Sequence, residues 1–511
     1  MTLFPNAAAR VRAGFILAAL LATCTALCAA VGFEAQAGAA ELKVGTAKAD
    51  ITPKKSVPLF GQFEMRLSEG VRSPLTVNVC AIEAVENGQP VDSAILVSMD
   101  LLYGYKTFGA RVREKVAAMR PEIQVDKIVT FGTHTHDAPS LEGGPEFPES
   151  DKTEGYQETL EDLSTRMAEA VATAWDARVP AEFSWGIEQI VLGQSRRACY
   201  FDGHAEMYGN PNKPEFSHYE NPSDPDLGTL FFWDRQGKLL SVVVNAACPS
   251  QIVEHLNALC ADYWHEVRNR LYQRFGDGVV VVACNAPAGD GAPHPQYRKL
   301  AVARMQDLRF GTEGSFEEKL MLEFARRIDQ AVGDAYECAV QDKRTDPAFR
   351  HISKNLELPL RIVTDAEYKE AVDSLAEYEK QLKDNPGKTP AEIAFMGFGW
   401  HGYVKDRYEA QHAGTAKPYS TVIHVIRFGE IAMATDEFEL FVDYSMRIKA
   451  RSPAMATFVA DISDGFGYYL PTAKAVKAGG YSAVIQCAPV SPEGGQILVE
   501  ETLGLLKKAM E

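Results

Sequence analysis

Two histidines separated by one residue form the most chemically suggestive pattern in this sequence. They lie in the run Thr133-His134-Thr135-His136, directly after a short apolar stretch, 128–131, that predicts a buried strand. Because side chains alternate along an extended chain, both imidazoles would point to the same side. They could bind a metal together, or one could bind it while the other contacts a substrate. The spacing alone is more often structural, and the position at a strand end favours a functional site.

Polar residues also follow three other predicted strands, at 93–99, 239–245 and 278–284. Asp100 follows the first of these strands, and the other two continue into the segments 245–250 and 284–294, which include Asp290. If the strand ends meet along one edge of a sheet, their side chains share one rim. The alternative at each position is turn chemistry, because Asp, Asn, Gly and Pro also simply end strands.

The elements that must position these residues alternate between strands and amphipathic helices. Helical spacing of apolar residues is clearest at 156–175, 316–336 and 365–383. Strands return from residue 421 onward, and no internal repeat or firm domain boundary interrupts the order. This alternation predicts an α/β fold with layered mixed β-sheets and flanking helices.

The N-terminus has the pattern of a secretory signal peptide. Arg10 and Arg12 precede an apolar run, 13–32, which is followed by small residues up to Ala40. We therefore expect residues 1–40 to direct export to the periplasm or the extracellular space. The alternative is a retained membrane anchor, because an apolar run of about 20 residues can just span a bilayer.

Composition excludes some classes of protein. The chain has a net charge of −17 and no basic run, which argues against a nucleic-acid partner. Hydrophobic residues make up 46% and charged residues 24%, as in an ordinary globular protein. Seven of the nine cysteines lie beyond the predicted signal, with irregular spacings and no C-x-x-C pair. We therefore expect at least one free thiol and no structural zinc knuckle.

Three segments, in order along the chain, together resemble the neutral ceramidase family. Residues 45–53, G-T-A-K-A-D-I-T-P, followed by 74–77, look like the family's opening, and 133–139, T-H-T-H-D-A-P, resembles its T-H-T-H-S-G-P segment. Residues 288–293, A-G-D-G-A-P, are similar to A-G-D-x-S-P. The resemblance implies that 41–511 is a ceramidase-like metal hydrolase domain, with no room for the C-terminal β-sandwich of the longer members.

The resemblance further implies a zinc ion held by a His, a second His, a Glu and a Tyr. The first ligand falls on His134, and Cys248 stands where the family has its second histidine. The glutamate falls on Glu437 of a D-E-F segment, and the tyrosine on Tyr469 in preference to Tyr468. A cysteine thiolate can replace histidine as a zinc ligand.

Other site residues are implied in the same way. His136 and Arg196 would orient the substrate, while Asp100 or Asp290 would assist proton transfer or support the ligands. The family's proposed serine nucleophile falls on Ala292, which has no nucleophilic atom. We therefore expect a zinc-activated water to attack an amide or ester carbonyl.

Two alternatives stay open at this point. Cys248 could itself be a thiol nucleophile with His136 as its base. The chain could instead be a catalytically degenerate paralogue that binds a lipid or a glycan. In either case the resemblance implies a small-molecule or lipid substrate and, with a lipid, peripheral contact with a membrane.

Overall fold

The computed structural model describes residues 40–142, 150–221 and 223–511, and Ala40–Glu511 form one compact unit. The predicted signal peptide, except for its last residue, lies outside the described residues. No helix in the described ranges combines the length and the apolar character that crossing a membrane requires.

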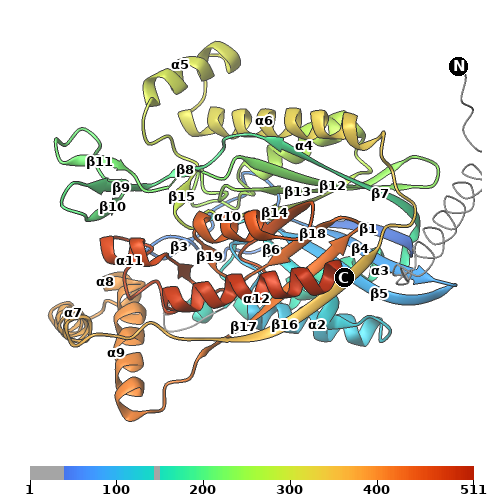
Figure 1. Ribbon diagram of the computed structural model, residues 1–511. Helices are drawn as coiled ribbons and strands as arrows, with labels where there is room; N and C mark the ends of the chain where they lie inside the picture. The colour runs from blue at the N-terminus through green and yellow to red at the C-terminus, as the bar shows by residue number, and fades with distance from the viewer. Residues whose placement is uncertain (1–39, 143–149, 222) are drawn as a thin grey trace, which may run out of the picture. The chain divides into compact units, whose positions relative to one another are not determined.

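An eight-stranded mixed sheet is the largest element of this unit (Figure 1). In order across the sheet its strands are β14 (Val280–Asn285), β13 (Leu239–Ala246), β12 (Asp226–Asp234), β7 (Val179–Gln189), β1 (Glu41–Asp50), β4 (Thr76–Glu86), β5 (Gln89–Met99) and β6 (Ile128–Gly132). Neighbours are antiparallel except at the two edges, where β13 pairs with β14 and β5 with β6 in parallel.

A smaller sheet packs face to face against the large one. Its strands are β16 (Phe349–Leu358), β17 (Tyr419–Phe428), β18 (Ile431–Thr435) and β20 (Ala456–Ala460). One apolar core contains Val44 and Leu96 from the large sheet together with Phe428 and Met433 from the small one. Strands β14, β18 and β20 are buried on both faces, and their sequences are accordingly mostly apolar.

Helices cover the outer faces of both sheets. On the large sheet these are α2 (Lys106–Met119), α3 (Tyr156–Asp176), α4 (Tyr263–Phe275) and α6 (Phe316–Ala339). On the small sheet they are α10 (Val442–Arg451) and α12 (Pro492–Met510). The predicted layered α/β fold is therefore confirmed, as a helix–sheet–sheet–helix arrangement.

The other elements are short or peripheral. The short strands are β2 (Pro58–Leu59), β3 (Arg66–Leu67), β8 (Gln194–Ser195), β9 (Arg197–Tyr200), β10 (Ala205–Met207), β11 (Phe216–Tyr219), β15 (Gly291–Ala292), β19 (Glu439–Leu440) and β21 (Tyr469–Leu470). The helices are α5 (Lys299–Phe310), α7 (Asp365–Asp384), α8 (Pro390–Ala394), α9 (Gly397–Ala413), α11 (Ala473–Ala478) and the 3-10 turns η1 (Val125–Lys127) and η2 (Ser150–Lys152).

The loops after several strands of both sheets meet at one rim. Ser250, after β13, donates a hydrogen bond from Oγ to the carbonyl oxygen of Thr133, after β6, at 2.6 Å. Asp461, after β20, donates its N–H to the carbonyl oxygen of Asn285 at the end of β14, at 3.1 Å. The shared rim expected from the sequence is therefore present, and it also includes loops of the small sheet.

Candidate functional site

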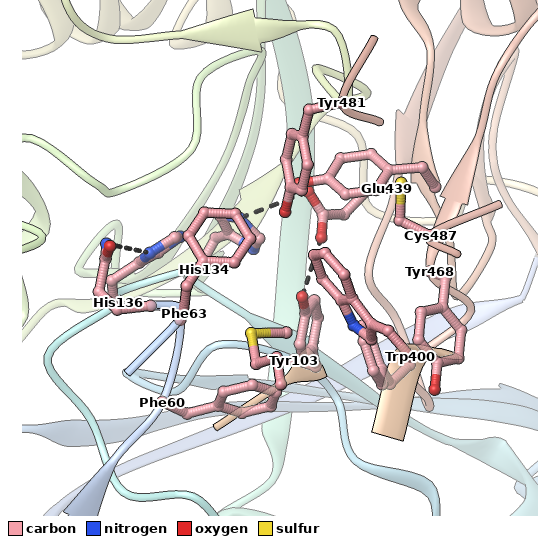
Figure 2. Close-up of a pocket in the computed structure, with 15 residues that line it drawn as sticks. Phe60, Phe63, Tyr103, His134, His136, Trp400, Glu439, Tyr468, Tyr481 and Cys487 are labelled. Carbon is pink, nitrogen blue, oxygen red and sulfur yellow. Dashed lines mark hydrogen bonds and ion pairs between the residues drawn. The ribbon is translucent and has the colours of Figure 1, made fainter. Parts of the chain in front are cut away.

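A narrow cavity of about 50 Å³ opens at this rim, between the two histidines and a wall of aromatic rings (Figure 2). Its aromatic lining residues are Phe60, Phe63, Tyr103, Trp400, Phe466, Tyr468, Tyr469 and Tyr481, and the other lining residues are Gly61, Gln62, His134, His136, Met396, Glu439 and Cys487. A smaller cavity of about 10 Å³ adjoins it and shares His134 and Glu439. The site thus combines a few ionisable groups with a largely apolar enclosure, as ligand sites commonly do.

His134 is held in an unusual backbone conformation that fixes its ring. Its φ is 66°, in the left-handed region, and its N–H donates to the carbonyl oxygen of Leu101 at 3.0 Å. Its Nδ1 lies 3.3 Å from the carbonyl oxygen of Leu102. Because a carbonyl oxygen only accepts, Nδ1 carries the proton and the lone pair of Nε2 faces Glu439, whose Oε2 is 3.8 Å away.

Glu439 and Tyr469 are brought together by the pairing of two short strands. In the parallel pair β19–β21, Glu439 lies directly opposite Tyr469. The hydroxyl of Tyr103 donates to Oε1 of Glu439 at 2.8 Å, which leaves Oε2 toward His134. Burial and then the negative charge of Glu439 raise the pKa of Tyr103 and of Tyr469, so both phenols are protonated in this electrostatic setting.

His136 lies beside His134, with the two ring centroids 5.1 Å apart. Its Nδ1 is 3.5 Å from Oε2 of Glu254, while its Nε2 is buried and has no hydrogen-bond partner among the described residues. Burial and the neighbouring His134 lower the pKa of His136 to about 3, so the ring is neutral. Gly61 allows this packing, because a Cβ there would lie 2.5 Å from the His136 ring.

Arg196 is the buried cation of the site. Its Nη2 donates to the hydroxyl of Tyr469 at 3.0 Å and to the carbonyl oxygen of Gly289 at 3.1 Å. The guanidinium also lies over the rings of Tyr469 and Tyr481, at 5.6 and 5.7 Å from their centroids. It lines the smaller cavity together with His134 and Glu439.

Glu437, which the resemblance implies as a ligand, does not face His134, whereas Glu439, two residues further on, does. The Glu437 carboxylate packs against Gly465, and Glu437 lines neither cavity that His134 lines. The cause is a turn after β18, in which Asp436 accepts the N–H of Phe438 at 3.0 Å. The chain therefore resumes strand pairing only at Glu439, and a match to the D-E-F letters cannot reveal that turn.

Cys248 is likewise not brought to His134. It lies in the apolar core under α4 and α6, and its Sγ donates to the carbonyl oxygen of Pro249 at 3.6 Å. Burial and the nearby Asp262 carboxylate raise the pKa of the Cys248 thiol well above its usual range. Cys248 lines neither cavity that His134 lines, so its thiol is out of reach of the site, and Pro249 reaches the smaller cavity in its place.

Both aspartates predicted at strand ends support the rim and do not face the main cavity. Asp100 accepts two hydrogen bonds from Arg268, at 2.7 and 3.0 Å, and one from Oγ1 of Thr133 at 3.3 Å. It therefore anchors the segment that carries the histidines. Asp290 accepts the N–H of Val442 at the start of α10, at 3.1 Å. Ala292 is buried in β15, outside both cavities.

Besides Glu439, sequence reasoning missed Tyr103, Glu254 and Trp400, which also shape the site. Burial alone would raise the pKa of Glu254, but contacts with His294 and His136 lower it to about 2, so it is an anion beside His136. Each of these residues lies far along the chain from its partner at the site, so no local spacing points to it.

A metal ion at this site would need Tyr469 as a ligand in addition to His134 and Glu439. Among the residues that the structure describes, no three His, Cys, Asp or Glu side chains are arranged to hold a metal ion together. The oxygens Oδ1 of Asp461 and Asn285 line the smaller cavity, are buried, and lack a hydrogen-bond partner within the described ranges. Unpartnered oxygens beside a buried carboxylate are a setting that a cation would compensate.

Comparison with known proteins relates the fold to two solved structures. No protein-family model matches the sequence, and no curated protein matches it. The neutral ceramidase from Pseudomonas aeruginosa superposes with a TM-score of 0.66 and 15% identity, over 92% of this chain and 75% of that chain. A ceramidase complexed with C2 gives a TM-score of 0.64 and 15% identity, over 92% and 76%. The chain therefore has the fold of these ceramidases.

Proposed function

We propose that this chain is an exported, zinc-dependent hydrolase of an amide (N-acyl) bond, with the metal held by His134, Glu439 and Tyr469. The observation that carries the proposal is the meeting of a neutral histidine, a carboxylate and a phenol at one buried cavity. The ceramidase fold supports the amide as the bond that is cleaved, with an ester as the related alternative. Export rests on the pattern of residues 1–40.

The three residues fit zinc in chemistry, and for His134 and Glu439 the spacing fits as well. Ligand atoms on one tetrahedral zinc lie about 3.3 Å apart, because Zn–N and Zn–O bonds are about 2.0–2.2 Å long. The 3.8 Å between Nε2 of His134 and Oε2 of Glu439 is close to that separation. Three protein ligands leave a fourth position open, as catalytic zinc sites require. When bound, zinc would supply the Lewis acidity that makes water a nucleophile at neutral pH.

The chain's own residues would orient the substrate and move a proton. With Nδ1 toward Glu254, His136 presents an unpaired Nε2 that can accept a hydrogen bond from water or substrate. Because its pKa is about 3, it would hold a proton only transiently, with the Glu254 carboxylate stabilising the charge. Arg196 places a fixed positive charge beside the cavity, where it can orient a carbonyl oxygen. The aromatic wall excludes water and fits the apolar part of an acylated substrate.

Two isosteric substitutions test whether Glu439 or Glu437, the glutamate of the D-E-F segment, is the metal ligand. Glu439→Gln should lower zinc content and reduce hydrolysis of a fluorogenic N-acyl substrate by about 100-fold or more. Glu437→Gln is the matched control and should keep both. Elemental analysis and initial rates are the measurements. Full zinc and full rate in Glu439→Gln, with losses in Glu437→Gln, would overturn the assignment.

A second candidate function is ligand binding without catalysis. It is favoured by Cys248, which faces the core and leaves no ligand in the place of the family's second histidine, and by Ala292, which has no nucleophilic atom. Zinc-free protein that binds an N-acylated lipid in calorimetry, yet is silent toward N-acyl and O-acyl substrates after zinc is added, would favour this candidate over the hydrolase.

A further inference from the structure

Helix α5 projects from the rest of the described unit (Figure 1). Three of its large apolar side chains are exposed. Leu300 is 89% exposed, Leu308 is 67% exposed and Met305 is 47% exposed. Keeping a leucine side chain in water is unfavourable compared with burying it. A group of exposed apolar side chains on one helix therefore suggests a surface that binds an apolar partner.

These residues form one face of the helix. Leu300 and Leu308 are eight positions apart, and Met305 is three from Leu308, so helical periodicity places them on the same side, with exposed Ala301 between them. The opposite side of α5 contacts the rest of the described unit. Gln306 is buried, and Asp307 forms an ion pair with Lys319 of α6 at 2.5 Å. The helix is therefore held in place with its apolar face turned outward.

Positive charge surrounds this face, although the whole chain is acidic. The basic residues at the start of α5 and on its exposed face are Arg298, Lys299 and Arg304, whereas Arg309 is ion-paired with Glu323 of α6. Arg304 lies within the exposed face itself, where its long side chain can extend past the leucines toward anionic groups. The α5 face of a second copy would bring the same positive charge to the contact, and the rest of a chain with a net charge of −17 would bring mostly polar, negative surface. An anionic phospholipid surface offers negative charge and an apolar interior together.

We propose that α5 docks this protein on an anionic phospholipid bilayer, with Leu300, Met305 and Leu308 inserted among the headgroups and the surrounding basic residues on the lipid phosphates. The proposal goes beyond the hydrolase function and does not depend on it, because binding to vesicles requires neither zinc nor turnover. If the substrate is a lipid, the same contact would hold the protein at its source.

Vesicle co-sedimentation of the purified protein tests the proposal. Wild-type protein should bind vesicles of phosphatidylcholine with phosphatidylglycerol, bind phosphatidylcholine alone more weakly, and dissociate as salt is raised. The double variant L300S/L308S should lower binding to the anionic vesicles by about tenfold or more, because it removes the apolar groups that insert. The matched control I362S/M455S replaces apolar residues that are 65% and 72% exposed elsewhere, and should bind as wild type does.

Three outcomes would overturn the proposal. The first is no binding of the wild type to anionic vesicles, and the second is equal binding by the L300S/L308S variant and its control. The third is a concentration-dependent dimer in analytical ultracentrifugation that L300S/L308S abolishes, which would make the α5 face a contact between copies. Circular dichroism and unchanged thermal melting would show that the variants are folded.

Discussion

At the scale of single residues, the site depends on which atom of each side chain is already bound. His134 uses Nδ1 on a backbone carbonyl and Glu439 uses Oε1 on Tyr103, so the remaining nitrogen and oxygen face each other. A ligand whose other atom is fixed in this way keeps its orientation when a metal binds. Tyr103 is therefore a positioning residue for Glu439.

Replacing Tyr103 tests that role. Tyr103→Phe should keep the ring in the cavity but remove the donor to Glu439, and so weaken zinc binding by about 10- to 100-fold. Tyr105→Phe is the control, because the Tyr105 hydroxyl contacts the carbonyl oxygen of Pro139 at 3.4 Å and does not contact Glu439. A zinc titration with a chromogenic chelator measures both variants, and equal affinities would contradict the role.

The same scale shows where sequence reasoning was sufficient and where it was not. His134 and His136 follow from spacing after a strand, and the structure places both at the main cavity with Tyr469. Arg196 lines the smaller cavity, which His134 shares. Glu439 could not be chosen over Glu437, because the turn between them depends on hydrogen bonds of Asp436 within the fold. The direction in which the Cys248 side chain points is also set by packing in the core, which the sequence pattern around it does not reveal.

At the scale of elements, helix α9 and the segment after β2 cover the cavity with aromatic rings. Phe63 meets Trp400 of α9 and Tyr481 edge-to-face, with centroids 5.5 and 5.4 Å apart. Strands and flanking helices were predictable from apolar periodicity, but this cover was not, because its three rings come from distant segments. A cavity of about 50 Å³ beneath it favours a short acyl group.

Opening this cover should change substrate size preference. Trp400→Ala should raise the ratio of kcat/KM for long over short N-acyl chains by about tenfold, because discrimination by a pocket wall is worth about 1–3 kcal/mol per methylene-sized group. Phe398→Ala, in the same helix, is the control, since Phe398 contacts Tyr378 and does not line the cavity. An unchanged ratio in Trp400→Ala would show that the ring does not limit the acyl group.

At the scale of the whole molecule, a buried histidine pair joins the two sheets. His351 of β16 lies 2.9 Å from His424 of β17 between Nε2 and Nδ1, and its Nδ1 lies 3.0 Å from the carbonyl oxygen of Ser93 in β5. Burial lowers the pKa of both histidines, and each also faces Lys127, whose charge acts in the same direction. Both rings are therefore neutral in the folded protein.

The pair should make the folded state less stable in acid. Below the unfolded pKa of about 6.5, the unfolded chain binds protons that the folded chain excludes, so stability falls as pH drops toward the depressed folded pKa. In that window each histidine lowers the free energy of unfolding by up to about 1.4 kcal/mol per unit decrease in pH. The decrease in Tm from pH 7 to pH 5 should be smaller in His351→Gln than in wild type by calorimetry; parallel curves would refute the argument.

The parallel pairing of β19 with β21 also has a consequence for how the protein matures. Glu439 meets Tyr469 only through this pairing, and Tyr103 reaches Glu439 from 336 positions away. A fragment that ends before β21 thus lacks Tyr469, and a nascent polypeptide would not hold the complete donor set until this last strand is added. Metal binding would then follow completion of the chain and stabilise the folded state at that late stage.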